Sequence, residues 1–164
     1  MEGAENVNEY FLYYDSPIGY IKISGYEEGI TSISFCEKTA TIIEDSVPTC
    51  LTECITQLDE YFKGKRNLFS IPLLINGTDF QKKVWSALVS IPYGKTSTYK
   101  EIAEMIKNPK GARAVGNANH NNPIAIIIPC HRVIGANGNL VGYAEGVWRK
   151  KYLLDLEKRL YNKY

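Results

Sequence analysis

The chain has 164 residues, of which 45% are hydrophobic, and its 19 Lys and Arg against 18 Asp and Glu give a net charge of +1. This length and composition suit one or two small domains with a real core and exclude a disordered polypeptide. Residues Met1 to Glu9 are acidic and polar, and no apolar stretch approaches about 18 residues, so we expect neither a signal peptide nor a membrane span. We therefore expect a cytoplasmic protein, or a nuclear one in a eukaryote.

The small net charge hides two halves of opposite sign. Residues 1–79 contain 5 Lys and Arg against 13 Asp and Glu, whereas residues 80–164 contain 14 against 5. Lys and Arg supply most of the sequence-independent affinity for nucleic acids, because they neutralise phosphates. The asymmetry predicts an acidic accessory domain followed by a basic domain that meets a polyanion. A dipolar protein with solvated faces is the alternative.

The N-terminal half predicts a small antiparallel sheet covered by one helix. Apolar and polar residues alternate over 10–14, 20–24 and 30–35, and turn-forming segments separate these runs, which is typical of strands joined by hairpins. The helix is predicted between Pro48 and Gly64, where apolar residues recur at helical spacing, at Leu51, Cys54, Ile55, Leu58, Tyr61 and Phe62. A turn-rich linker over 76–79 follows it and indicates a boundary between domains 1–76 and 77–164.

The basic half begins with two predicted helices. The first can be capped by Thr78 or Asp79 and ends before Pro92. The second begins at Thr98, where Glu101 completes a capping box. The apolar stripe of the first consists of Phe80, Val84, Leu88 and Ile91, and that of the second of Ile102, Ala103 and Ile106.

A third helix is predicted over 110–120, after a tight turn at 107–109. Two short helices joined by such a turn predict a helix-turn-helix. The third helix is unusually rich in Gly and Ala, and small residues let a backbone come close to a large partner. Lys110 and Arg113 favour a nucleic-acid backbone as that partner, with tight packing against a neighbouring helix as the alternative.

A thiol and an imidazole adjoin at Cys130 and His131, at the end of the apolar run 125–128. Pro129 makes a rigid exit from the core, where a nucleophile could be held at the mouth of a pocket. Arg132 adds a fixed cation that favours thiolate. A cysteine that only packs in the core is the alternative.

The remaining cysteines lack C-x-x-C spacing, and Cys50 and Cys54 share one helix face, which predicts core positions rather than a metal site. A final helix is predicted over 146–161. Glu157 lies within its apolar stripe of leucines, and a buried carboxylate needs a partner. His131 is the partner of interest, and an arginine is the alternative.

The segment Ile128-Pro129-Cys130-His131-Arg132-Val133 resembles the active-site signature of the O6-alkylguanine-DNA alkyltransferases, the methylated-DNA–protein-cysteine methyltransferase family. The resemblance is strong over the second half and architectural over the first. It implies an α+β fold, in which an N-terminal ribonuclease H-like antiparallel sheet with a helix precedes a mostly helical, winged-helix-like domain with a helix-turn-helix. Other motifs follow in the family's order: Phe80-Gln81-x-x-Val84-Trp85, Ile91-Pro92-Tyr93-Gly94-Lys95-Thr96, Tyr99-x-x-Ile102-Ala103, Ala112-Arg113-Ala114-Val115-Gly116, Asn121-Asn122-Pro123 and Gly142-Tyr143.

The resemblance implies direct-reversal DNA repair. Cys130 would take the alkyl group irreversibly from O6-alkylguanine, and also from O4-methylthymine, so that each molecule acts once. His131 would remove the thiol proton through a water, Glu157 would orient the imidazole, and Tyr99 would donate to the base ring. No cofactor, metal or nucleotide-type methyl donor is expected, because the DNA itself carries the alkyl group.

The same resemblance implies a monomer that binds double-stranded DNA containing O6-alkylguanine in the minor groove, and that could do so cooperatively. The damaged nucleotide would be flipped out, with Arg113 filling the vacated space and Tyr99 pressing on the adjacent phosphate. No membrane partner is expected. Further DNA contacts are expected at Lys100, Lys110, Gly111, Ala112 and Ala114, with Gly116 and Ala118 also suiting a close approach.

The guanine pocket is implied by the same motifs. Asn122 would hold the cysteine segment to the helix-turn-helix, and the carbonyls of Cys130 and Val133 would read the exocyclic amine. Gly142, Tyr143 and Ala144 would form one wall. Some members have a serine in place of Ala144, which leaves the range of adducts open. Two alternatives are a damage sensor without chemistry, which the presence of Cys130 disfavours, and a cysteine hydrolase, which would need an oxyanion hole.

Overall fold

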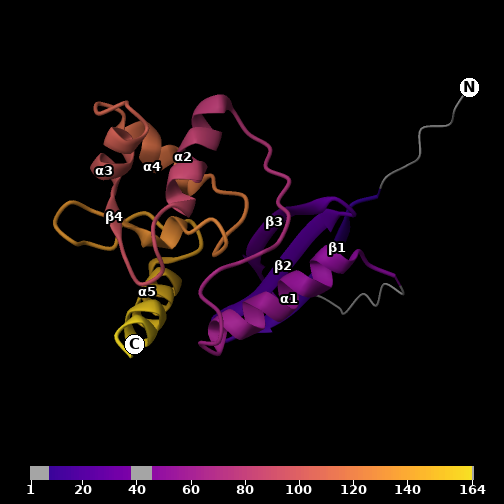
Figure 1. Cartoon of the computed structure of the whole chain (residues 1–164). Coiled ribbons are helices and arrows are strands. Elements are labelled where there is room, and N and C mark those ends of the chain that lie inside the picture. The colour runs from indigo at the N-terminus through magenta and orange to yellow at the C-terminus, as the bar shows by residue number, and fades with distance from the viewer. Residues whose placement is uncertain (1–7, 38–45, 164) are drawn as a thin grey trace, which may run out of the picture.

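The computed structural model describes residues 8–37 and 46–163. Strands β1 (Tyr10–Ser16), β2 (Gly19–Tyr26) and β3 (Gly29–Cys36) form an antiparallel sheet in the order β1-β2-β3. Helix α1 (Thr49–Phe62) lies across this sheet (Figure 1). The predicted strands and helix are confirmed. Of the segment Met1 to Glu9, residues 1–7 lie outside the described part.

The second half is mainly helical, so the α+β class is confirmed. Helices α3 and α4 pack together and on α2, as a helix-turn-helix requires (Figure 1). Among the described residues, no helix is both long and apolar enough to span a bilayer. The elements are α2 (Asp79–Val89), β4 (Ser97–Thr98), α3 (Tyr99–Met105), α4 (Ala112–His120), the 3-10 turn η1 (Cys130–Arg132), β5 (Val133–Ile134) and α5 (Val147–Tyr161).

Capping side chains set the starts of α2 and α3. Thr78 accepts from the Gln81 backbone N–H and the Gln81 side chain accepts from the Thr78 N–H, which selects Thr78 as the cap. Thr98 and Glu101 form the predicted capping box of α3. Helix α4 begins at Ala112, later than predicted. The reason is local, since the preceding residues form a separate turn.

The edge strand β3 joins the sheet to the segment that precedes Cys130. The Ile33 N–H donates to the Pro123 carbonyl at 3.0 Å, and the Ala125 N–H donates to the Ile33 carbonyl at 3.1 Å. Backbone bonds of this kind leave little freedom in position, because each donor and acceptor is fixed to its strand. The N-terminal sheet therefore helps to hold the cysteine-bearing segment in place.

Candidate active site

Tight turns, rather than an extended strand, carry the chain to Cys130. The run 124–128 is largely buried, as the sequence predicts, but Ile126 has a φ of 71°, a rare and strained conformation for a β-branched residue. Pro129 then forms an inverse γ-turn, with φ −81° and ψ 63°, in which the Cys130 N–H donates to the Ile128 carbonyl at 2.8 Å. Cys130 begins η1 directly after this turn.

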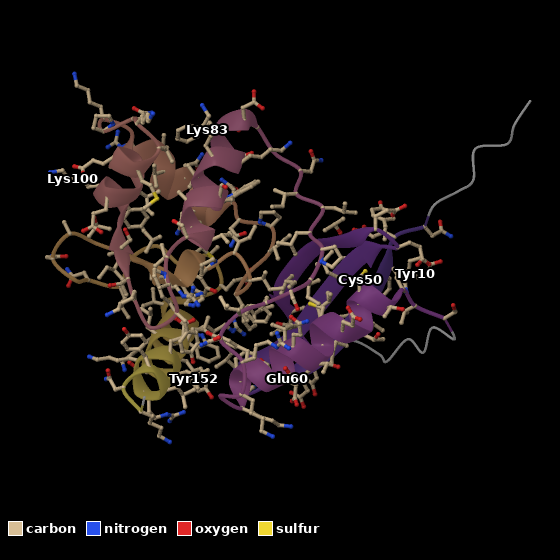
Figure 2. The ribbon with its side chains drawn as sticks, in the orientation of Figure 1. Tyr10, Cys50, Glu60, Lys83, Lys100 and Tyr152 are labelled. Atoms are coloured by element: carbon tan, nitrogen blue, oxygen red, sulfur yellow. The ribbon has the colours of Figure 1, made fainter. Side chains whose placement is uncertain are left out.

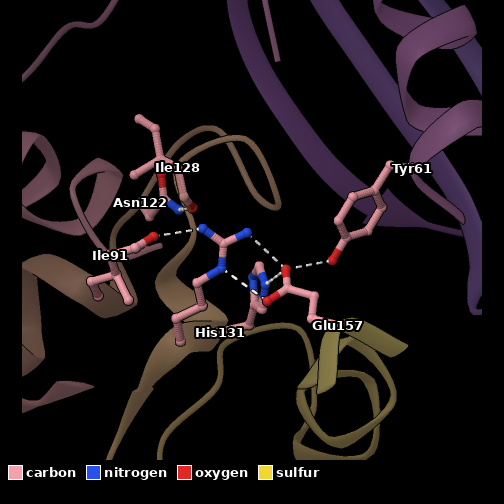
Figure 3. Close-up of polar contacts among 7 residues, drawn as sticks. Tyr61, Ile91, Asn122, Ile128, His131 and Glu157 are labelled. Atoms are coloured by element: carbon pink, nitrogen blue, oxygen red, sulfur yellow. Dashed lines mark hydrogen bonds and ion pairs between the residues drawn. The ribbon is translucent and has the colours of Figure 1, made fainter. Parts of the chain in front are cut away.

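Asn122 fastens these turns to the end of α4. Its Nδ2 donates to the Ile128 carbonyl at 2.8 Å (Figure 3). Its Oδ1 accepts from the Ile124 N–H at 3.0 Å. These two bonds hold both ends of the turn segment, Ile124 and Ile128, to one side chain. This placement agrees with the expectation that Asn122 holds the cysteine segment to the helix-turn-helix.

The buried Glu157 carboxylate is the centre of a polar network. Its Oε1 accepts from His131 Nε2 at 2.8 Å and from the Tyr61 hydroxyl at 2.8 Å (Figure 3). Arg132 adds two bonds, from Nε to Oε2 and from Nη2 to Oε1, each at 2.9 Å. The predicted contact with His131 is confirmed, and the alternative partner, an arginine, is present as well. We call these four residues the Glu157 network.

The network determines which nitrogen of His131 is free. Burial opposes ionisation of Glu157, but His131 and the permanent charge of Arg132 hold its pKa below the usual value. Burial lowers the pKa of His131, so the ring is neutral at pH 7. A carboxylate only accepts hydrogen bonds, so Nε2 carries the ring proton and Nδ1 keeps its lone pair. Nδ1 is buried and has no partner among the described residues, so it can act as a base.

Cys130 is protonated in the free protein at neutral pH. Burial raises the pKa of its thiol to about 11, while the Asn122 side chain and the charge of Lys150 act in the opposite direction. Arg132 was expected to be the cation at the thiol. Instead it is bound to Glu157 and, through Nη1 at 2.8 Å, to the Ile91 carbonyl. The cation that favours the thiolate is Lys150.

Tyr99 contacts the segment that contains Tyr143. The Tyr99 hydroxyl donates to the Val141 carbonyl at 3.1 Å, and an added Cβ on Gly142 would lie 3.7 Å from that hydroxyl. Burial raises the pKa of both tyrosines, and a negative charge on Cys130 acts in the same direction. Val133 is buried next to η1, in β5, whereas Ala144 is exposed in the segment between Tyr143 and α5.

Helix α4 divides into a buried and an exposed face. Val115, Ala118 and Asn119 are buried, whereas Arg113 and Ala114 are exposed. Of the other residues expected at DNA, Lys100 and Lys110 are exposed, while Ala112 and Tyr99 are partly buried. Lys100 and Lys83 lie on the helical part, away from the sheet that carries Tyr10 (Figure 2).

Two small residues of this region, both expected to suit a close approach to DNA, are buried in the free protein. Gly111 is buried, its N–H donates to the Asn108 carbonyl at 2.9 Å, and an added Cβ would lie 2.7 Å from Asn108 Nδ2. Ala118 is buried, and its carbonyl accepts from Trp85 Nε1 at 2.8 Å. The expected DNA contact at Gly111 stays a prediction, and in the free protein this residue packs against Asn108.

Sequence reasoning missed Tyr61 and Lys150. Tyr61 belongs to the apolar stripe of α1, but a buried tyrosine hydroxyl needs a partner, and that requirement was the available signal. Lys150 is completely buried and lies on α5, three residues before Leu153 and seven before Glu157. That spacing places it on the inward stripe, so its position on the helix was also a signal.

Cys50 and Cys54 occupy core positions, as predicted. Cys50 and Cys54 are buried on α1, and the Cys50 thiol donates to the Tyr26 carbonyl at 3.2 Å. Within residues 8–37 and 46–163, no group of three or more His, Cys, Asp or Glu side chains could hold a metal ion.

Two protein-family models match this chain, and known proteins are similar to it over most of its length. The model of the 6-O-methylguanine DNA methyltransferase ribonuclease-like domain matches residues 10–75, and that of the DNA binding domain matches residues 79–159. A methylated-DNA–protein-cysteine methyltransferase from Methanosarcina acetivorans is 51% identical over 152 residues, which are 90% of this chain and 97% of that protein. A protein of the same name from Mycobacterium tuberculosis is 48% identical over 147 residues, 88% of this chain and 89% of that protein.

Solved structures show the same similarity. The crystal structure of Mycobacterium tuberculosis O6-methylguanine methyltransferase superposes with a TM-score of 0.83 at 46% identity, covering 93% of this chain and 94% of that one. A structure of the Mycobacterium tuberculosis protein in complex with DNA gives a TM-score of 0.83 at 47% identity, covering 92% and 93% of the two chains.

Proposed function

Because this chain belongs to the 6-O-methylguanine DNA methyltransferase family, a family of DNA-repair enzymes, we propose that Cys130 is its methyl acceptor and that each molecule reacts once. The observation that carries the proposal is the orientation of His131. Glu157 accepts a hydrogen bond from His131 Nε2, which leaves Nδ1 of the same ring unprotonated. His131 is the residue next to Cys130, so this nitrogen is the candidate base for the thiol.

The proposed reaction is one displacement. His131 Nδ1 takes the thiol proton through a water molecule, and the sulfur attacks the carbon bound to guanine O6. The carbon–oxygen bond breaks, its electron pair passes to the guanine, and Tyr99 donates a hydrogen bond to the base as negative charge develops. The product is a neutral thioether, which no ordinary base hydrolyses. A thiol with a pKa of about 11 needs this proton acceptor at neutral pH.

The proposed DNA-binding surface is the exposed side of α3 and α4. Guanine O6 cannot be reached inside a duplex, so the nucleotide is flipped out and Arg113 fills the space from the minor groove. Tyr99 presses on the neighbouring phosphate. Lys100 and Lys110 contact phosphates, and Ala112 and Ala114 allow close approach. Their exposure supports this proposal for all but Tyr99 and Ala112, which are partly buried.

The proposed guanine pocket lies between Cys130 and the segment that contains Tyr143 and Ala144. The carbonyls of Cys130 and Val133 read the exocyclic amine, and Asn122 holds the floor of the pocket. In the free protein the Cys130 carbonyl accepts from the Val133 N–H and, at 3.4 Å, from Asn119 Nδ2, so the longer bond to Asn119 is the one to be released when this carbonyl accepts from the exocyclic amine. O4-methylthymine presents the same kind of methyl ether and is a second substrate.

The division into domains 1–76 and 77–164 is part of the proposal. The two family models, which match residues 10–75 and 79–159, support a boundary near residue 77. We propose that the protein works as a monomer in the compartment that holds the DNA, the cytoplasm or, in a eukaryote, the nucleus.

The test is the mass of the intact protein after incubation with a duplex that contains one O6-methylguanine. We expect one added methyl group, located on Cys130 by peptide mapping, and never more product than protein. Cys130→Ser is the control, and it should bind the duplex without gaining mass. Methylation elsewhere, or product in molar excess, would contradict the proposal. A parallel duplex with O4-methylthymine tests the second substrate.

A further inference from the structure

Lys150 is a buried charge to which the reaction described above assigns no part. Its side chain is completely buried, and no ion pair among the described residues includes it. Burying an ammonium group without a counter-ion costs several kcal/mol. Its Nζ donates to the Val141 carbonyl at 3.1 Å. A cost of this size, at a residue that binds the backbone next to the proposed pocket wall, indicates a function rather than packing alone.

The Val141 carbonyl is shared by two donors. The Tyr99 hydroxyl also donates to it, at 3.1 Å. A carbonyl oxygen has two lone pairs and can accept both bonds at once. Val141 comes directly before the segment 142–144, which forms the proposed wall of the pocket. Two side chains therefore bind the backbone next to this wall. Tyr99, on α3, precedes the wall in the sequence, and Lys150, on α5, follows it.

The proposed reaction requires Tyr99 to change partners. A hydroxyl has one proton, so Tyr99 must release the Val141 carbonyl when it donates to the flipped base. We propose that Lys150 is a positioning residue, which keeps the Val141 carbonyl bonded and the pocket wall in place while Tyr99 turns to the base. This inference rests on the proposed role of Tyr99.

Lys150 can also act on Cys130 directly, and the two effects differ in their dependence on Tyr99. Burial lowers the pKa of Lys150 to about 8, so most of the side chain is charged at pH 7 and favours the thiolate. That electrostatic effect does not need the Tyr99 hydroxyl. The positioning effect does need it, because without the hydroxyl no bond to Val141 is given up.

A double-mutant cycle separates the two effects. We would measure the single-turnover rate with free O6-benzylguanine and with an O6-methylguanine duplex for wild type, Lys150→Met, Tyr99→Phe and the double variant. The loss of the remaining donor to Val141 should make the slowing by Lys150→Met about tenfold larger in the wild type than in the Tyr99→Phe background. Equal slowing in the two backgrounds would overturn the proposal, because a purely electrostatic or structural effect of Lys150 cancels in this ratio.

Lys151→Met is the matched control. It is the same substitution one residue along α5, on an exposed side chain that pairs with Asp155, and it should leave the rate unchanged. Thermal unfolding establishes that Lys150→Met is folded. If it is not, Lys150→Gln, which keeps a donor on an uncharged side chain, takes its place, and a smaller coupling of the same sign is expected. Failure of the proposed function itself is visible separately, as a wild-type protein that gains no methyl group.

Discussion

The Glu157 network and the exposed face of α4 differ in how their polar groups are satisfied. In the network, one buried carboxylate accepts four hydrogen bonds from Tyr61, His131 and Arg132. On α4, Arg113 projects into solvent and has no partner among the described residues. A preformed network orients reacting groups before substrate arrives, whereas an unpaired surface cation is free to meet a phosphate or a base stack. Changes in the first region should affect both folding and chemistry, and changes in the second should affect only DNA.

The largest effect is expected from Glu157→Gln. The substitution leaves Arg132 as a buried charge without its counter-ion and removes the acceptor that orients His131. We expect the free energy of unfolding to fall by about 3–5 kcal/mol and alkyl transfer to slow, with DNA affinity nearly unchanged. Denaturant unfolding, transfer rates and DNA titration measure the three quantities. An unaltered transfer rate would remove Glu157 from the proton relay.

His131 and Glu157 together predict that the protein loses stability in acid. The folded-state pKa values of His131 and Glu157 both lie below their ordinary values, so the unfolded chain binds more protons as pH falls. Stability should therefore decrease as pH falls below about 6.5, where unfolded histidine becomes protonated, and again below about 4.3, where unfolded glutamate does. Unfolding free energies at a series of pH values check this. In Glu157→Gln the second decrease should be smaller, and equal curves would show that other groups cause it.

Tyr61→Phe should have an intermediate effect. It removes the hydrogen bond of 2.8 Å that the Tyr61 hydroxyl, on the N-terminal helix α1, donates to the charged carboxylate of Glu157. Such a bond contributes about 1.5–3 kcal/mol, and we expect unfolding free energy to fall by that amount. Affinity for undamaged duplex DNA should not change. If stability is unchanged, the coupling of the two halves through this network is absent.

Arg113→Ala should show the opposite pattern. Because the side chain is exposed, we expect stability to change by less than about 0.5 kcal/mol. Reaction with duplex substrate should fall about tenfold, since the space left by the flipped base is no longer filled. Reaction with free O6-benzylguanine should be unaffected. Equal losses with both substrates would contradict the role of Arg113 in base flipping.

The smallest effect is expected from Lys110→Ala. A lysine that contacts one phosphate contributes affinity without sequence preference, so binding should weaken slightly and equally for all duplexes. The slope of log affinity against log salt should decrease in magnitude by about 1. An unchanged slope would place Lys110 outside the DNA interface. Stability should remain as in the wild type.

The sequence by itself predicted the three N-terminal strands, the main helices, the family and the candidate pair Cys130 and His131. Local rules were sufficient there, because capping at Thr78 and Thr98, the alternation of the strands and the spacing of α1 depend on neighbours along the chain. The inward position of Glu157 was also readable from helical spacing. The start of α4 differs from the prediction for a local reason too, since Gly111 belongs to the preceding turn rather than to the helix.

Only the tertiary structure decided the partners. Tyr61 and Glu157 are 96 residues apart, and no local pattern shows that one hydroxyl from the N-terminal helix completes the network. The same holds for Arg132, which binds Glu157 instead of facing the thiol, and for Lys150, which takes that place. Periodicity shows that a side chain faces inward. Which groups it meets there depends on how distant elements pack, because a buried charge is stabilised by whatever the fold brings to it.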